Sequence, residues 1–317
     1  MVMWVGTSAD KDHTGTADAD ILSRAGGDDT ISGGTDVDTN SGSAEIDDIS
    51  GGLGDDSLVG IGVTYRITGG AGNYIITGGT GSNSVLNCGE GQDLITSQSA
   101  WNSRNTVLGG AGNEIIGGEG GADGLSCGSG NDTITDTSGN NVLVAGDGND
   151  VLTNLFGWGS RSTLSPGEGD DLINGGAGRE TIHGGAGDYT ISGEGDTDFL
   201  SGWGGNHLIV FAAAASTLEG DYGDDTINAS GGRGNNHTQR GGAGNDDLSS
   251  GGGADHLSGG SGDDTLSGGA GDINATGNSD ANVLIGNSGA NSLSGVAGND
   301  NLSGGAGADA LCGGAVV

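Results

Sequence analysis

Acidic residues recur at intervals of about nine residues along most of this 317-residue chain. Three consecutive nonapeptides show the pattern most clearly: residues 241–249 read GGAGNDDLS, residues 250–258 read SGGGADHLS and residues 259–267 read GGSGDDTLS. Glycines fill most of positions 1 to 4, an acid occupies position 6, and an aliphatic residue occupies position 8. Carboxylates and backbone carbonyls are the hard oxygen ligands that calcium takes. The spacing therefore predicts calcium sites that are built around the position-6 acids.

The repeat can be followed through nearly the whole chain. Counting forward from Asp20 gives 32 turns, with one residue inserted near Asn87 and three-residue inserts near residues 97–99, 154–156 and 229–231. The predicted calcium ligands are the acids at position 6: Asp20, Asp29, Asp38, Asp47, Asp56, Asp93, Glu114, Asp123, Asp132, Asp150, Asp171, Glu180, Asp198, Asp225, Asp246, Asp255, Asp264, Asp300 and Asp309.

These acids are divided unevenly between odd-numbered and even-numbered turns. An acid occupies position 6 in 12 of the 16 odd turns but in only 7 of the 16 even turns, and the three longer inserts all precede even turns. If two turns make one coil, odd and even turns lie on opposite edges of a stack. We therefore expect a row of calcium sites along one edge and a partly metal-free second edge.

The glycines and the aliphatic residues indicate the elements that position these acids. Glycine adopts backbone conformations that are closed to other residues, so six residues can turn sharply and aim their carbonyls inward. Positions 7 to 9 then form a short strand with the position-8 side chain pointing into a core. One nonapeptide cannot bury that side chain by itself, so stability requires a stack of repeats.

The nonapeptides of residues 241–267 match the pattern GGxGxDxUx, in which U is a large aliphatic residue. Over most of its length the chain resembles the RTX (repeats-in-toxin) family of bacterial secreted proteins. The resemblance implies an all-β fold, a parallel β-roll or β-helix solenoid of about 16 two-turn coils, with calcium held between a turn and the turn 18 residues later. We expect an N-terminal start or cap at 1–14, a continuous β-roll over 15–312 and a C-terminal end at 313–317.

Composition excludes several classes of protein. The chain has 75 Gly without a three-residue period, so it is not collagen. Its formal net charge is −35 and it has only 8 Lys and Arg, so we expect no nucleic-acid partner. No apolar run is long enough for a membrane span. Such acidity is also typical of disorder, and we expect a chain that is largely unfolded without calcium and folded with it.

The sequence offers no sign of an enzyme. HExxH and GxSxG are both absent, and the single Lys, Lys11, stands outside any phosphate-binding loop. No segment outside the repeats is long enough for a catalytic domain. We therefore expect no catalytic residues and no cofactor other than Ca²⁺.

Some turns lack an acid at position 6. Tyr65, Tyr74, Tyr189, His207 and His237 stand there instead, and Asn83 stands there in the eighth turn. The Tyr and His residues could be ligands of another metal or sugar-stacking residues, or these turns could be degenerate and bind no calcium. We favour the last interpretation.

Two turns that follow inserts are alike, because Trp101 to Val107 and Trp158 to Leu164 share Trp, Ser, Arg and Thr at matching places. They could be contact loops, or each Trp could cover a coil without calcium. Cys88 and Cys127 fall two coils apart on one edge, too far for a disulfide.

Three functions remain open. The first is a calcium-binding extracellular structural protein, a self-assembling subunit of a surface layer, sheath or filament whose partner is mainly itself. The second is the C-terminal repeat module of a larger secreted toxin, adhesin or hydrolase. The third and weakest is an ice-binding or polysaccharide-binding strand face, with cell-surface polysaccharide as a further partner, because the Thr residues at position 7 are interrupted by other residue types.

The resemblance implies a secreted or cell-surface bacterial protein. RTX relatives usually leave the cell by a type I route that uses a signal beyond the repeats, whereas here the repeats run to the final GGAVV. The start MVMWVGTSADKD lacks the features of a Sec signal peptide. We expect a fragment or a non-Sec route of another kind.

Overall fold

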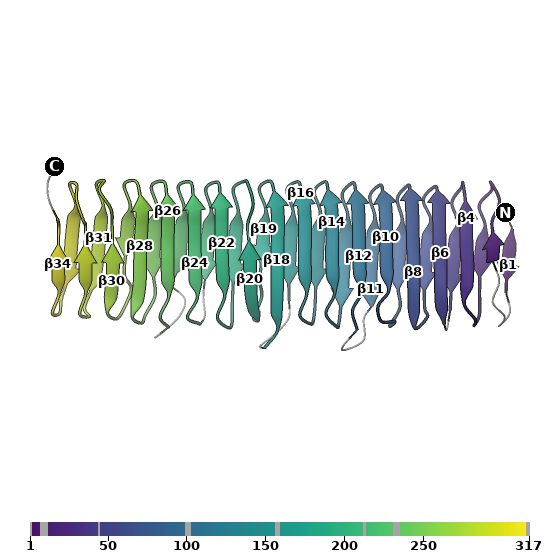
Figure 1. Ribbon diagram of the computed structural model, residues 1–317, viewed down its shortest axis with the longest axis horizontal. Coiled ribbons are helices and arrows are strands. Elements are labelled where there is room, and N and C mark those ends of the chain that lie inside the picture. The colour runs from purple at the N-terminus through teal and green to yellow at the C-terminus, as the bar shows by residue number, and fades with distance from the viewer. Residues whose placement is uncertain are drawn as a thin grey trace. The chain divides into compact units, whose positions relative to one another are not determined.

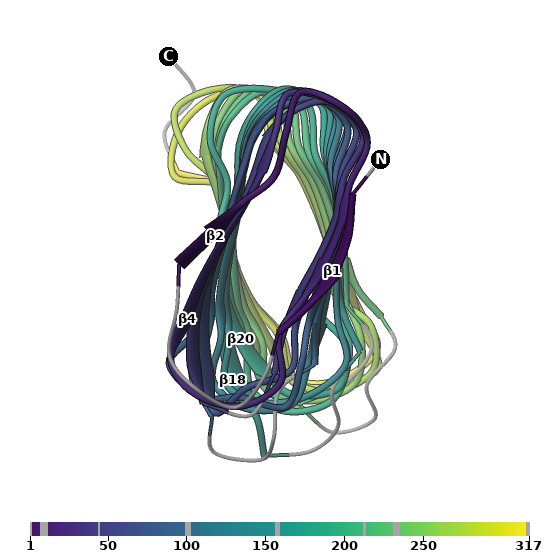
Figure 2. The ribbon, with the colours of Figure 1, turned by 90° about the vertical axis from the view of Figure 1, so that its right-hand side faces the viewer.

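The chain is an all-β parallel solenoid of about 16 coils, as predicted. The computed structural model describes residues 2–6, 12–43, 45–98, 103–155, 159–211, 214–230 and 235–314. These residues form 34 strands and no helix. The chain divides into two compact units, Met1–Phe156 and Gly157–Val317. Within each unit, successive strands alternate between two facing sheets, here called sheet A and sheet B (Figures 1 and 2).

The first unit carries strands β1 to β17. Its sheet A consists of β1 (Met3–Val5), β3 (Ile21–Ser23), β5 (Thr39–Gly42), β7 (Ser57–Gly60), β9 (Ile75–Gly78), β11 (Leu94–Gln98), β13 (Ile115–Glu119), β15 (Thr133–Asp136) and β17 (Val151–Asn154). Its sheet B consists of β2 (Asp12–Thr14), β4 (Asp29–Gly34), β6 (Ile46–Leu53), β8 (Thr64–Ala71), β10 (Val85–Glu90), β12 (Thr106–Ala111), β14 (Gly124–Ser129) and β16 (Val142–Asp147).

The second unit carries strands β18 to β34. Its sheet A consists of β19 (Leu172–Asn174), β21 (Thr190–Gly193), β23 (Leu208–Phe211), β25 (Thr226–Ala229), β27 (Asp247–Ser250), β29 (Thr265–Ser267), β31 (Val283–Asn287) and β33 (Asn301–Gly305). Its sheet B consists of β18 (Arg161–Glu168), β20 (Arg179–His183), β22 (Phe199–Gly204), β24 (Thr217–Tyr222), β26 (Thr238–Ala243), β28 (Asp255–Ser261), β30 (Ile273–Thr276), β32 (Ser292–Ser294) and β34 (Ala310–Cys312).

Within each unit, each strand pairs in parallel with the strand that follows it one coil later in the same sheet. Leu248 on β27 is the Cα partner of Leu266 on β29, 18 residues later. Where a three-residue insert intervenes the step is 21, as between Ile227 and Leu248. The 18-residue coil predicted from two nonapeptides is thus confirmed.

The core is the column of position-8 side chains. Leu22, Ile49, Ile116, Leu152 and Ile209 are examples that are at most 1% exposed. Removing one such side chain from water stabilises the fold by roughly 1.5–3 kcal/mol, and each is buried only because the next coil covers it.

Two polar side chains, Asn40 and Gln239, stand in this column and are fully buried. Their amides donate to the carbonyl oxygens of Ser50 and Ser249, at 2.9 and 3.1 Å, across the core.

The structure corrects the eighth turn of the predicted register. Ser84 occupies position 6 there, because Leu86 is buried while Asn83 is exposed with φ +60°. The extra residue therefore precedes position 6, and the predicted location near Asn87, which lies within β10, is wrong. A strand locked by parallel pairing cannot hold an additional residue, so the turn takes it.

For the same reason, the longer inserts begin later in the chain than the sequence predicted. Ser97 and Gln98 pair with Gly118 and Glu119 in sheet A, and Ala229 pairs with Ser250, so these residues belong to strands. The inserts begin after them.

The segment predicted as a start or cap already forms part of the solenoid. β1 and β2 pair with β3 and β4 and add one more coil. In this coil the rings of Trp4 and His13 stack with centroids 4.1 Å apart, and the Arg24 guanidinium lies over Trp4 at 4.2 Å. No helix of the described residues is long and apolar enough to cross a membrane.

Candidate metal centres in the turns

The turns that lead into sheet A strands are uniform, and we call their side of each unit the regular edge. In most of them the residues at positions 2 and 4 have positive φ; Gly242 and Gly244, for example, have φ +121° and +142°. A Cβ built on either would overlap a backbone carbonyl oxygen of the preceding coil, that of Asp221 or that of Gly223. Glycine thus lets the backbone carbonyls of successive turns approach closely. Within each unit the turns follow one another in a row (Figure 1).

The position-6 acids of the regular edge are tied to the coil before them. Oδ1 of Asp246 accepts the backbone N–H of Asp225 at 2.9 Å, and Oδ1 of Asp264 accepts that of Asp246 at 3.1 Å. The same bond joins Asp38 to Asp20, Asp56 to Asp38, Asp132 to Glu114 and Asp150 to Asp132, at 2.7 to 2.8 Å. The carboxylates are therefore held inside the stack.

The second carboxylate oxygen tests whether a cation fits. In Asp38, Asp56, Asp132, Asp225 and Asp246 this Oδ2 is buried and has no hydrogen-bond partner in the protein. A buried anionic oxygen without a partner is costly. A Cβ on the position-1 residue Gly241 would overlap Oδ2 of Asp246, so this glycine keeps the space beside the oxygen open. Unsatisfied hard oxygens in a glycine-lined space fit calcium.

The raised pKa values of these acids also favour a bound cation. Burial, with the charges of neighbouring acids, raises the pKa of Asp56 and Asp246 to about 6 and that of Asp225 to about 7. Burial, followed by the charge of Asp132, also raises the pKa of Glu114. At neutral pH these acids lack a counter-charge, which a divalent cation would supply.

Most of the predicted ligands lie where the sequence placed them. All nineteen occupy position 6, and seventeen are buried; Asp300 and Asp309 are half-buried. Asp20 and Asp264 have hydrogen-bond partners in the protein that reduce their capacity to bind a cation. Both oxygens of Asp20 accept protein hydrogen bonds, from Val2 and Thr16, and Oδ2 of Asp264 accepts one from Asn278 at 3.1 Å.

A second row of side chains on the regular edge was missed by the sequence reasoning. Asp or Asn at position 5 accepts the backbone N–H of the position-5 residue one coil later, as Asp224 does from Asn245 at 2.7 Å and Asn245 from Asp263 at 2.9 Å. Asp55, Asn73, Asn113, Asn131, Asp170, Asp188, Asn206 and Asp263 form the same bond. The recurrence of Asn and Asp at this position was the available signal. The position-5 side chains accept hydrogen bonds from the following coil, whereas the position-6 side chains accept them from the preceding coil.

The turns that lead into sheet B strands form the other side of each unit, which we call the variable edge. Its predicted ligands are Asp29, Asp47, Asp123, Glu180, Asp198, Asp255 and Asp309. At Asp29 the protein supplies its own cation: Arg24, at position 1 of the same turn, is 2% exposed, and its Nη1 lies 3.5 Å from Oδ1 of Asp29. Position 1 is elsewhere a glycine or another small residue in most turns, so the guanidinium fills a space that is open in other turns.

An unpredicted acid also lies on this edge. Asp136 at position 1 is fully buried, its Oδ1 accepts the N–H of Ser138 at 2.8 Å, and burial raises its pKa to about 7.

Tyrosines at position 6 close their turns with hydroxyl groups. Tyr65, Tyr74 and Tyr189 are each 1% exposed. Their hydroxyls donate to turn carbonyl oxygens: Tyr74 to Gly52 at 2.7 Å, Tyr189 to Gly167 at 2.5 Å, and Tyr65 to Gly79 at 2.9 Å. A neutral hydroxyl there satisfies a carbonyl that could otherwise face a cation, which supports the interpretation of degenerate turns.

The two histidines at position 6 replace the acid as hydrogen-bond acceptor. Nδ1 of His207 accepts the N–H of Tyr189 at 3.2 Å, and Nδ1 of His237 accepts that of Ser216 at 3.3 Å. Burial lowers the pKa of both imidazoles, so both are neutral acceptors near pH 7.

The two tryptophans that define the paired turns, Trp101 and Trp158, lie outside the described residues, so the choice between contact loops and covered coils stays open. Cys88, Cys127 and Cys312 are free thiols, the first two buried.

The sequence model of the RTX calcium-binding nonapeptide repeat matches residues 41–60, 66–86, 102–125, 128–157, 163–191, 178–206, 213–236, 240–272 and 276–315. A search of curated proteins returned no match. A glycine-turned parallel solenoid with buried acids in most coils fits a calcium-binding repeat protein. Because the family matches well over half of its length, the chain belongs to the RTX calcium-binding nonapeptide repeat family. Its repeats are calcium-binding motifs that are typical of secreted proteins.

Proposed function

We propose that this chain is an extracellular structural protein that calcium folds and that self-associates through the outer face of sheet A into a surface layer, sheath or filament. The observation that carries the proposal is the lack of charge on that face. In the first unit, the outward residues at positions 7 and 9 of β5 to β17 are Thr39, Ser41, Ser57, Val59, Ile75, Thr77, Leu94, Thr96, Ile115, Gly117, Thr133, Thr135, Val151 and Thr153. None is charged, in a chain whose formal net charge is −35.

Part of this face is apolar. Ile75, Leu94 and Ile115 are Cα partners in successive strands and are 53%, 44% and 55% exposed. Contiguous exposed aliphatic side chains are typical of interaction sites. In the second unit, one acid, Asp247, stands among the outward residues at positions 7 and 9 of β19 to β33.

The proposed partner is a second copy of the same face. Two strongly acidic chains repel each other over most of their surfaces, and an uncharged face minimises that cost. The sheets also differ, because sheet B of the first unit carries Asp48 and Arg66 at its outward positions. The proposed contact is therefore between sheet faces.

In this proposal the chain folds when it binds calcium. Position-6 acids of neighbouring coils would each lend their unpartnered oxygens to an ion, together with turn carbonyls. Millimolar extracellular calcium would fill sites of the affinity typical of extracellular modules, and resting cytosol would not.

The test is sedimentation and negative-stain electron microscopy of the purified chain in calcium, with Leu94→Lys as the variant. Val142→Lys is the matched control, since Val142 is an aliphatic residue at position 7 of the same unit, 48% exposed, but on sheet B. We expect ordered assemblies that Leu94→Lys weakens and Val142→Lys preserves. Isolated monomers of the wild-type chain in calcium would refute self-assembly and favour the repeat module of a larger secreted protein.

A further inference from the structure

Two exposed aromatic side chains lie on adjacent strands of sheet B in the second unit, one register position apart. Trp203 on β22 is 61% exposed and Tyr222 on β24 is 65% exposed. Among the described residues they are the only Trp, Tyr or Phe side chains exposed to this degree. Trp203 is the Cα partner of Asp221, and Tyr222 that of Gly204, so the two rings project from adjacent strands.

The chain holds this pair in an unfavourable backbone conformation. Trp203 and Asp221 occupy position 2 of their turns with φ +84° and +76°. Glycine holds position 2 with positive φ in other turns of the regular edge, such as Gly242 and Gly260. Left-handed conformation is unfavourable for residues that carry a Cβ, and such residues concentrate at functional sites. Val296 also occupies position 2 with φ +77°, so the exposed aromatic side chains, more than the backbone conformation, set Trp203 and Tyr222 apart.

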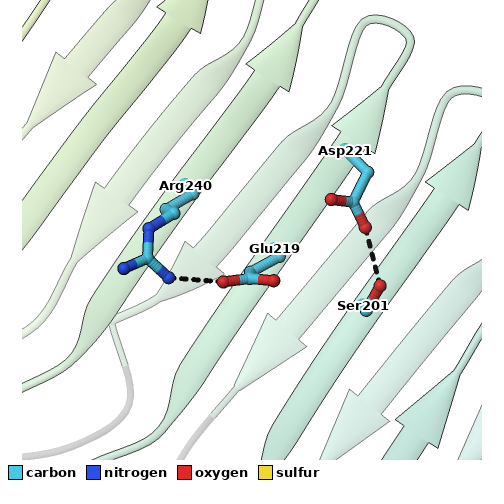
Figure 3. Close-up of polar contacts among 4 residues, drawn as sticks. All are labelled: Ser201, Glu219, Asp221 and Arg240. Carbon is cyan, nitrogen blue, oxygen red and sulfur yellow. Dashed lines mark hydrogen bonds and ion pairs between the residues drawn. The ribbon is translucent and has the colours of Figure 1, made fainter.

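Polar side chains lie on the same strands as the rings and on the strand that follows. The hydroxyl of Ser201 donates to Oδ2 of Asp221 at 2.6 Å, and Arg240 forms an ion pair with Glu219 one strand away (Figure 3). The Arg240 side chain is 53% exposed and that of Glu219 is 23% exposed, so both remain accessible to a ligand.

Two further rings lie on β22 and on the preceding strand of sheet B, β20. His183 on β20 and Phe199 on β22 lie with ring centroids 5.9 Å apart, and both side chains project from outward positions of sheet B. Four rings therefore stand on three successive strands of a chain in which aromatic residues make up 3%.

We propose that Trp203, Tyr222, Asp221, Glu219 and Arg240 form a binding site for a neutral polysaccharide built of pyranose units. A pyranose offers an apolar C–H face, which stacks on an aromatic ring, and a rim of hydroxyls, which bond to carboxylates and guanidinium groups. The flat sheet suits an extended polymer. Acidic polymers, nucleic acids included, are disfavoured because the chain is strongly acidic.

Affinity electrophoresis in calcium tests this site, with hydroxyethylcellulose, xyloglucan and soluble starch as neutral probes and alginate as the acidic control. Trp203→Gly is the decisive variant, because glycine suits the positive φ and removes the ring without adding strain. We expect at least one neutral probe to retard the wild-type chain, and Trp203→Gly to weaken that retardation at least tenfold while its melting temperature stays equal or rises. Leu172→Ala, which removes an exposed aliphatic side chain from sheet A of the same unit, serves as the matched control and should bind normally.

Three results would overturn the proposal. These are no retardation of the wild-type chain by any neutral probe, equal retardation of Trp203→Gly, or an effect of Trp203→Gly on sedimentation of the chain alone. The last result would make the rings a contact between copies. The site lies on sheet B, so its failure leaves the proposed sheet A contact untouched.

Discussion

Oδ1 of Asp132 accepts the backbone N–H of Glu114 at 2.7 Å, and the two acids occupy the same position in successive coils. The bond orients one oxygen of Asp132 toward the backbone and leaves the buried Oδ2 without a protein partner. Burial raises the pKa of both carboxyl groups. One hydrogen bond thus holds together a pair of acids whose charges a bound cation would offset, which is the basis of the proposed link between folding and calcium.

The metal-free chain should lose stability as pH rises. Burial raises the pKa of Asp56 to about 6 and those of Asp225 and Asp198 to about 7, against 3.8 for an ordinary Asp. Between these values the folded state binds more protons than the unfolded state, so the free energy of unfolding falls as pH increases. Urea titrations of chelator-treated protein at pH 4.5 and 7.5, followed by circular dichroism, should give the higher midpoint at pH 4.5.

With calcium the pH dependence should reverse. Protons compete with the ion for the same carboxylates, so apparent calcium affinity should weaken as pH falls below about 6 to 7. Calorimetric titration at pH 7.5 and 5.5 measures this, and affinity that is independent of pH would contradict the assignment of these acids as ligands.

Asp132→Asn should separate the hydrogen bond from the charge. The amide oxygen can still accept the N–H of Glu114, but the unpartnered anionic oxygen is gone. We expect at least one fewer bound calcium per chain by native mass spectrometry, and a metal-free state that is more stable at pH 7.5 than the wild type because a buried charge is removed. Asp147→Asn, at an exposed position of the next turn on this edge, makes the same charge change and should alter neither quantity.

Gly241→Ala should damage a metal site and the stacking of the coils together. The added Cβ would overlap Oδ2 of Asp246 within its own turn. We expect a loss of about 1–3 kcal/mol in unfolding free energy with calcium present. Gly124→Ala is the control, because a Cβ there meets nothing within 4 Å, and it should be neutral or stabilise by about 0.4–1 kcal/mol. Equal effects of the two substitutions, measured by thermal unfolding, would contradict the role of position 1.

Tyr74→Phe tests the tyrosine-closed turns. Loss of the hydroxyl leaves the half-buried carbonyl of Gly52 without this donor, so unfolding free energy should fall by about 0.5–1.5 kcal/mol. The number of bound calcium ions should stay the same, because the turn is not a predicted site. A change in that number, with stability intact, would mean that the turn binds metal through Tyr74.

The sequence by itself determined the repeat, the core and the class of fold. A nine-residue spacing of glycines, acids and aliphatic residues indicates a stack of alternating turns and strands. In this stack Leu248 and the other position-8 residues face inward, and Asp246 and the other position-6 residues end each turn. That information is local, because each nonapeptide carries its own turn and strand.

The contacts between coils were decided only by the tertiary structure, since they join residues 18, 19 or 21 positions apart. Pairing placed Ser84 at position 6 in place of Asn83, and it revealed the position-5 row, which the motif leaves unspecified. Strand pairing also divides the Thr residues of position 7 between the two sheets. Sheet A of the first unit therefore has an uncharged outer face, although other residue types interrupt these Thr residues in the linear sequence. The exposed pair of Trp203 and Tyr222 arose in the same way, because residues 19 apart become neighbours only when coils stack.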